Sequence, residues 1–281
     1  MLGLPESGKT SYLAALYELI SHDDVPGALR IEALPADRQY LQTIHERWLR
    51  CEPAIRSRSE QPQSIRFSIR IETGELRPLS VPDVAGESVR KVWEERRWDP
   101  GLLDLAASAS AVMLFVRSDE IHPPKRIKTL SEPVEDMPGD EGDEGDEEPD
   151  TAKEPFDASK APTQVKLTDL LQSTLKVNPA RPLRVAVVLS AWDCVEREEI
   201  SPYDLLRIQL PLLWQYLQSN PERILYHVFG VSAQGGEFSE SVKNNPLLKV
   251  FPPSTRSRFI DGQEVSHDVS GPLRWLWAQP A

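Results

Sequence analysis

The hydrophobic residues of this chain fall into continuous runs, alternating runs and helically spaced positions. Residues 111–116 are a continuous apolar run, as expected for a strand covered on both faces, and residues 183–189, apolar except for Arg184, are expected to form another buried strand. Residues 64–73 alternate apolar and polar positions, which predicts a strand with one exposed face. Gly74 supplies a turn, so residues 76–81 are expected to return as the second strand of a hairpin. Further strands are expected at 29–34 and 224–231.

Segments with helical spacing of apolar residues separate these strands. In residues 11–20 apolar side chains recur every three or four positions from Leu13 onward, so they share one helix face. The same spacing predicts a long helix at 201–219, which Pro211 is expected to kink. Other helices are expected at 35–50, at 88–107 with a break near 99–101, at 165–177 and at 271–279.

A glycine-rich segment, Gly3–Thr10, precedes the first helix; we call it the phosphate loop. It fits the pattern G-x-x-x-x-G-K-[ST], whose backbone N–H groups curl around phosphates. Lys9 is expected to reach the β- and γ-phosphates as a catalytic residue, and the Thr10 hydroxyl to bind Mg²⁺. The alternative is an ordinary glycine turn that caps a helix. The nucleotide-binding residues expected here are Gly3, Glu6, Ser7, Gly8, Lys9, Thr10 and Ser11.

The segment before the phosphate loop is short for this motif. A phosphate loop normally leaves the end of a buried strand, but only Met1 and Leu2 precede Gly3. We expect a truncated first strand and a natural start upstream of Met1. The alternative is that a central strand is missing.

A second informative segment, Asp83-Val-Ala-Gly-Glu87, directly follows the predicted hairpin. Together with the phosphate loop, this D-x-x-G sequence predicts a switch, in which Asp83 holds Mg²⁺ and the Gly86 N–H bonds the γ-phosphate. Glu87 either positions the attacking water, as a catalytic residue, or is an acidic residue favoured by the helix dipole. A carboxylate beside the γ-phosphate is repelled unless it is protonated or paired.

The formal net charge of −12 is concentrated in one segment. Between Ser131 and Pro162, thirteen Asp or Glu stand against two Lys, a balance of −11, so the rest of the chain carries −1. This low-complexity stretch predicts a disordered acidic insertion at about 131–163 within a single domain, 1–281. No basic stripe with interleaved aromatic residues occurs, which argues against a nucleic-acid partner.

The apolar runs and the cysteines bear on location. The longest run, 111–116, is too short to cross a bilayer, and no signal peptide precedes the phosphate loop. Cys51 and Cys194 lie far apart, without metal-ligand spacing around either. We therefore expect a reduced, cytoplasmic protein without a membrane partner.

In their order along the chain, these motifs resemble those of translation-factor-related GTPases with a Ras-like core, most of all the GTPase domains of bacterial double-GTPase systems. The resemblance covers nearly the whole chain except the acidic insertion. It implies an α/β fold, a three-layer α/β/α P-loop NTPase with a mostly parallel sheet and one antiparallel strand. It also implies GTP and Mg²⁺ as ligands and a protein partner, such as an effector, an activator or a second GTPase.

The resemblance extends in part to the residues that read the base. Asp193 matches the Asp of N-K-x-D, which accepts hydrogen bonds from guanine, whereas Ser190-Ala191 replaces the Asn-Lys pair. Ser232-Ala233 matches the S-A-K segment, and Gln234 stands in place of its Lys. The resemblance therefore implies guanine as the base, and the missing lysines weaken the expected selectivity for guanine over other bases.

The first-switch region of such GTPases supplies a hydroxyl to Mg²⁺. Ser59 is the candidate here, and the alternative is a solvated loop serine. No arginine is identifiable as a charge-neutralising finger, although Arg56, Arg58 and Arg90 lie near the switches in sequence.

Three functions are compatible with these residues. The leading hypothesis is a molecular switch that binds GTP with Mg²⁺ and hydrolyses it slowly unless a partner stimulates it. The second is a nucleotide-bound interaction module with little turnover, which Glu87 and the short first strand favour. The third is an ATPase, which the absent Asn-Lys pair allows.

Overall fold

The computed structural model describes residues 1–33, 38–54, 63–71, 74–83, 86–124, 157–195, 200–236 and 245–278, and at 63–64 and 82–83 it describes the backbone only.

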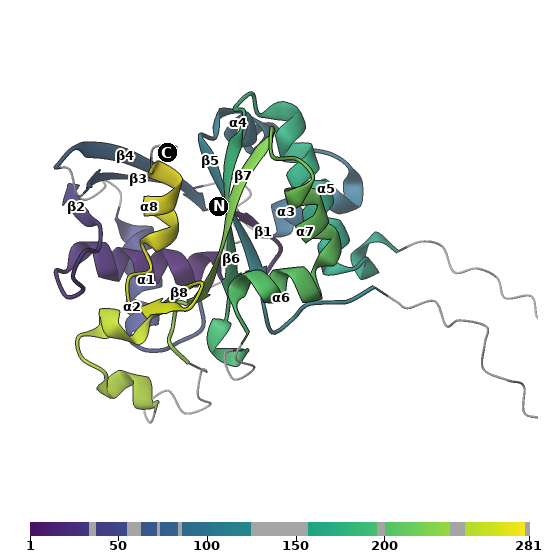
Figure 1. Cartoon of the computed structure of the whole chain (residues 1–281). Coiled ribbons are helices and arrows are strands. Elements are labelled where there is room, and N and C mark those ends of the chain that lie inside the picture. Colours follow the sequence, from purple (N-terminus) through teal and green to yellow (C-terminus); the bar gives the residue numbers. More distant parts are fainter. Residues whose placement is uncertain are drawn as a thin grey trace, which may run out of the picture.

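The main sheet has six strands in the order β1-β5-β6-β7-β8-β9 (Figure 1). Strands β1, β5, β6 and β7 run parallel, and β8 and β9 form an antiparallel hairpin at one edge. The predicted three-layer fold with a mostly parallel sheet is therefore confirmed. The strands are β1 (Leu2–Gly3), β5 (Ala111–Arg117), β6 (Leu183–Ser190), β7 (Ile224–Ser232), β8 (Arg258–Asp261) and β9 (Glu264–Ser266).

Strand β1 consists of two residues only, as the short segment before the phosphate loop predicts. It still joins the sheet, because Leu2 pairs with Leu114 of β5 and Gly3 with Phe115. The phosphate loop therefore starts at the carboxyl edge of the parallel sheet, the edge at which open α/β sheets bind ligands.

The apolar run in β5 is buried on both faces. Val112, Leu114 and Val116 belong to one core cluster, whereas Met113 and Phe115 belong to a second cluster on the opposite face. Because successive strand residues point to opposite faces, a continuous apolar run is what a strand between two cores requires.

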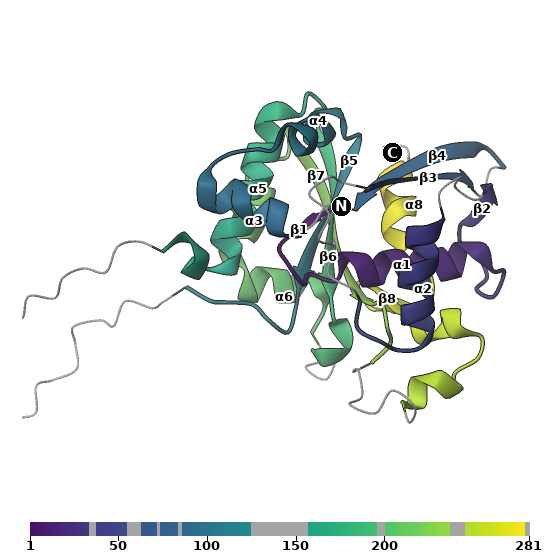
Figure 2. The same ribbon diagram turned by 180° about the vertical axis from the view of Figure 1, so that it is seen from behind.

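Helices cover both faces of the main sheet, as Figure 2 shows from behind. Helices α1, α2 and α8 lie on one face, and α3 to α7 on the other. Four short 3₁₀ helices complete the described elements: η1 (Ala158–Lys160), η2 (Trp192–Cys194), η5 (Pro246–Lys249) and η6 (Pro253–Arg256). The α-helices are α1 (Lys9–Ser21), α2 (Gln39–Leu49), α3 (Gly86–Glu95), α4 (Pro100–Ser108), α5 (Thr163–Val177), α6 (Pro202–Gln209), α7 (Pro211–Gln218) and α8 (Gly271–Trp277).

The predicted hairpin is confirmed, but it belongs to a separate sheet rather than to the main one. Strands β2 (Arg30–Ala33), β3 (Gln63–Arg70) and β4 (Leu76–Asp83) form this antiparallel sheet. The buried residues of β3 pack in the same core cluster as α1 and α2. Strand β4 runs two residues past the predicted end, so that the D-x-x-G segment begins inside a strand.

Two expectations about helices need correction. The helix predicted at 201–219 is two helices, α6 and α7, that meet at Pro211, because proline lacks the N–H and clashes with the preceding turn. Helix α2 begins at Gln39, later than predicted, and residues 34–37 lie outside the described residues. The break predicted near 99–101 separates α3 from α4, and the Asp99 side chain caps α4.

Most of the predicted acidic insertion, up to residue 156, lies outside the described residues, but its last seven residues do not. Helix η1 and the start of α5 occupy this part. The Trp93 indole N–H donates to the Ala158 carbonyl at 2.7 Å, which fixes η1 against α3. Residues 158–160 and 163, which the prediction placed in the insertion, therefore belong to helices.

Candidate functional site

The backbone of the phosphate loop requires glycine at two positions. Gly8 has φ 83°, in the left-handed region, and a Cβ there would lie 2.9 Å from the Ser190 side chain of β6. A Cβ at Gly3 would lie 2.7 Å from the Phe115 carbonyl of β5. The loop is therefore pressed against the ends of two parallel strands before α1 begins at Lys9.

Lys9 turns its ammonium group into the phosphate loop. Lys9 is only 6% exposed. Its Nζ donates to the Gly3 and Leu4 carbonyls at 2.9 and 3.0 Å and to Ser7 Oγ at 3.1 Å. A buried ammonium requires such acceptors. The amino-terminal end of α1 adds a partial positive charge at the same place, so the loop offers a binding site for an anion.

The D-x-x-G segment meets the phosphate loop at Gly86. A Cβ on this buried residue would lie 2.4 Å from Pro5 Cα and 2.6 Å from Pro5 N, so only glycine allows this approach. Glu87 follows in the first turn of α3 and is half-buried. Asp83 ends β4, its side chain is outside the described atoms, and Ser59 lies outside the described residues.

Asp193 and Ser232 come together from neighbouring strands. Asp193 lies in η2 just after β6, and Ser232 ends β7. The buried Ser232 hydroxyl donates to Asp193 Oδ1 and accepts from the Gly235 N–H at 3.1 Å. The carboxylate is thus held in place at the carboxyl edge of the sheet.

The Ser-Ala-Trp sequence before Asp193 has a structural role that the sequence did not indicate. Ser190 Oγ donates to the Ser7 carbonyl of the phosphate loop at 2.9 Å. Ala191 follows with φ 52°, and Trp192 is buried against Gly230, where an added Cβ would lie 2.6 Å from the indole. Hence Ser190 ties the start of this turn to the phosphate loop, and Trp192 anchors the turn in the core.

Ala233 and Gln234 both form hydrogen bonds with Trp48 of α2. The Ala233 carbonyl accepts from the Trp48 indole at 2.9 Å and from Ser257 Oγ at 2.8 Å. The Gln234 amide donates to the Trp48 carbonyl at 3.2 Å and is buried. Gln234, at the position of the lysine in S-A-K, therefore anchors α2.

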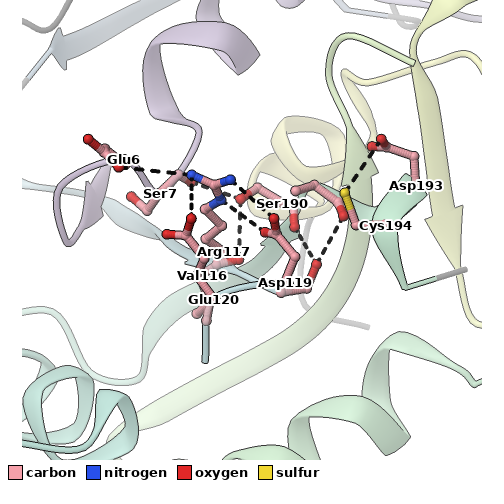
Figure 3. Close-up of polar contacts among 11 residues, drawn as sticks. Glu6, Ser7, Val116, Arg117, Asp119, Glu120, Ser190, Asp193 and Cys194 are labelled. Carbon is pink, nitrogen blue, oxygen red and sulfur yellow. Dashed lines mark hydrogen bonds and ion pairs between the residues drawn. The ribbon is translucent and has the colours of Figure 1, made fainter. Parts of the chain in front are cut away.

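Arg117, at the carboxyl end of β5, is a site residue that sequence reasoning missed. It pairs in register with Ser190 and carries an ion pair to Glu6 of the phosphate loop, with Nη1 4.0 Å from Oε2 (Figure 3). The hydrogen bond and the charge of Asp119 raise the pKa of the Arg117 guanidinium. A signal existed, because a charged residue that ends a buried parallel strand lies at the ligand-binding edge.

One large cavity lined by described residues lies away from the phosphate loop. Its volume is about 1080 Å³, and its lining includes Leu29, Phe259 and Trp275 but no residue of the phosphate loop. A much smaller hollow adjoins the loop and is lined by Thr10 and Ser11 of α1, by Gln234 and by residues of α2 and the segment after it.

Residues 1–276 match the model of the protein family described as Double-GTPase 1. No protein of curated function matches the chain. Among the described residues, no helix combines the length and the apolar character needed to span a membrane.

Proposed function

Because the chain belongs to the Double-GTPase 1 family, we propose that it is a molecular switch that binds GTP with Mg²⁺ and hydrolyses it slowly until a protein partner stimulates it. The observation that carries this proposal is the contact between Gly86 and Pro5, which joins the D-x-x-G segment to the phosphate loop.

The phosphates would bind within the loop. Lys9 and the amino-terminal turn of α1 supply positive charge there, and the loop amides supply donors, with Gly3, Glu6, Ser7, Gly8 and Ser11 in its wall. Phosphoryl transfer needs little covalent chemistry from the protein, so positioning and charge neutralisation are the main contributions of these residues.

The expected magnesium ligands are all oxygen donors, which suits this hard cation. The Thr10 hydroxyl would be one ligand, from the second residue of α1. Asp83 and Ser59 would supply the others. When bound, the ion neutralises charge between the β- and γ-phosphates.

The Gly86 contact supplies the switch. The Gly86 N–H belongs to the first residue of α3, which touches the loop where the γ-phosphate would lie. A terminal phosphate that accepts from this N–H would stabilise the contact, and its loss after hydrolysis would release the segment before α3.

Guanine is the base that Asp193 supports. A carboxylate held by Ser232 can accept hydrogen bonds from the ring N–H and the exocyclic amine of guanine, whereas adenine offers no matching pair of donors. Discrimination of this kind is strong when the site contains polar groups that the wrong ligand leaves unpaired.

Replacing Ser232 with alanine is expected to weaken GTP binding about tenfold, because Asp193 loses the hydroxyl that orients it. Binding of ATP should change less than threefold. A fluorescent-nucleotide titration measures both affinities, and Ser159→Ala is the matched control, since it removes a Ser–Asp hydrogen bond on η1. An equal loss for both nucleotides would contradict a role in reading guanine.

Single-turnover hydrolysis of labelled GTP and ATP tests the activity itself. We expect slow phosphate release from GTP and at least about tenfold less from ATP. No release from either nucleotide would leave an interaction module in which nucleotide is a structural ligand, and preference for ATP would contradict the guanine assignment.

Glu87 is the residue we propose to position the attacking water. Its replacement by alanine is expected to lower the single-turnover rate about tenfold or more with little change in nucleotide affinity. Glu95→Gln, at the far end of α3, is the control. An unchanged rate would mean that Glu87 is only an acidic residue favoured by the helix dipole.

The proposal includes a protein partner, because Glu87 replaces the glutamine that assists hydrolysis in small GTPases. The partner would be an activator, an effector or a second GTPase. It also assigns the chain to the cytoplasm, in keeping with Cys51 and Cys194, which are both free thiols. Nucleic acid and membrane are not expected partners.

A further inference from the structure

Arg117 is surrounded by carboxylates at the mouth of the proposed nucleotide site. It is the last residue of β5, directly beside Ser190, whose hydroxyl holds the phosphate loop. Figure 3 shows its guanidinium between Asp119 on one side and Glu6 and Glu120 on the other. Its side chain is 34% exposed, so the guanidinium lies at the surface of the site.

Asp119 holds the edge of the guanidinium formed by Nε and Nη2. Nε and Nη2 donate to the two Asp119 oxygens at 2.9 and 3.1 Å, a bidentate arrangement that sets its plane. Nη1 then points to Glu120, at 3.2 Å, and to Glu6, at 4.0 Å. Asp119 therefore orients the arginine, and Glu6 is the one partner that belongs to the phosphate loop.

Glu6 poses an electrostatic problem for a loop that holds a polyanion. It is the fourth residue of the loop and has φ 60°, so its backbone is already in a sparsely populated conformation. Its carboxylate lies within a Debye length of the phosphates that the loop would bind, and like charges at this range repel. A neighbouring cation reduces this repulsion.

We propose that Arg117 is a positioning residue that neutralises Glu6 and holds its carboxylate away from the phosphate-binding side of the loop. This inference rests on the proposed function. It explains why a loop with one lysine tolerates an acidic residue, and it gives a role to a second cation, which comes from β5 and not from the loop itself.

The test compares GTP affinity, by fluorescent-nucleotide titration, in the wild type, Arg117→Ala, Glu6→Gln and the double variant. Arg117→Ala is expected to weaken binding about tenfold at low salt, and the loss should shrink as salt rises. Glu6→Gln should bind GTP more tightly than the wild type at low salt, because the carboxylate that repels the phosphates is gone while Arg117 remains. In the double variant, Glu6→Gln should restore affinity to within about threefold of the wild type, because the charge to be neutralised is gone.

Arg70→Ala is the matched control, since Arg70 also binds a carboxylate, Glu32, through two nitrogens and has comparable exposure, but lies in the second sheet. It should leave GTP affinity unchanged. If Arg117→Ala does not fold, as thermal unfolding would show, Arg117→Gln keeps a polar side chain without the charge and is subject to the same expectations.

Three outcomes overturn the inference. Unchanged affinity in Arg117→Ala, with binding intact in the wild type, would remove the inference and leave the proposed function standing. A loss that Glu6→Gln does not rescue, or one that is independent of salt, would show that Arg117 acts by another route. Absence of GTP binding by the wild type would remove both the inference and the proposed function.

Discussion

Replacing Lys9 with alanine is expected to weaken nucleoside triphosphate binding by at least a hundredfold, or about 2.7 kcal/mol. The ammonium group is held inside the phosphate loop by the Gly3 and Leu4 carbonyls and by Ser7 Oγ, and it is the only lysine of the loop. Charge-assisted hydrogen bonds to phosphate are stronger than neutral ones, so losing them lowers the affinity for the nucleotide. Calorimetric titration with GTP and Mg²⁺ measures the change.

Two comparisons make the Lys9 result specific. Lys176→Ala removes an exposed lysine in the last turn of α5 and should leave affinity unchanged. Thermal unfolding without nucleotide reports the separate cost of leaving the loop carbonyls without their buried donor. Unchanged affinity in a folded Lys9→Ala variant would place the nucleotide, if any binds, outside this loop.

Gly86→Ala has the second-largest expected effect. The new Cβ would lie 2.4 Å from Pro5 Cα, so either the loop or the start of α3 must move. Overpacking against backbone typically costs about 1–3 kcal/mol of unfolding free energy. The displaced segment could no longer reach a γ-phosphate, so we expect saturating GTP to raise the melting temperature of the variant no more than GDP does.

Thermal unfolding of the wild type and Gly86→Ala with GTP, with GDP and without nucleotide checks this expectation. Gly101→Ala is the matched control, because it adds a methyl group in the first turn of α4, where the nearest neighbour is the end of the Asp99 side chain at 3.3 Å. Should Gly86→Ala respond to GTP like the wild type, the contact with Pro5 is not part of a switch.

Part of the site follows from short stretches of sequence. The phosphate loop needs glycines, a lysine and a hydroxyl at fixed spacing, so Gly3–Thr10 indicates phosphate binding without any knowledge of distant residues. The pairing of Asp193 with Ser232 could be anticipated as well, because each follows the end of a predicted strand. Asp83 and Ser59 as magnesium ligands stay predictions.

The remainder of the site could not be read from sequence, because it depends on which strand ends lie side by side. Arg117 meets Glu6 only because β5 lies between β1 and β6 in the sheet. In the sequence, Ser190 stands where related GTPases have the Asn of N-K-x-D. In the structure, its hydroxyl donates to the Ser7 carbonyl and so holds the phosphate loop. Gln234 is likewise turned toward Trp48 of α2.

The sequence by itself determined the local structure of this protein: buried strands from continuous apolar runs, the β3–β4 hairpin from alternation and Gly74, and the loop from its glycines. These features depend on interactions between residues close in the chain. Only the tertiary structure decided that the hairpin forms its own sheet, that Gly86 abuts Pro5, and that Arg117 reaches Glu6. The physical reason is that such contacts depend on strand order and register, which the packing of the whole core fixes and no single segment encodes.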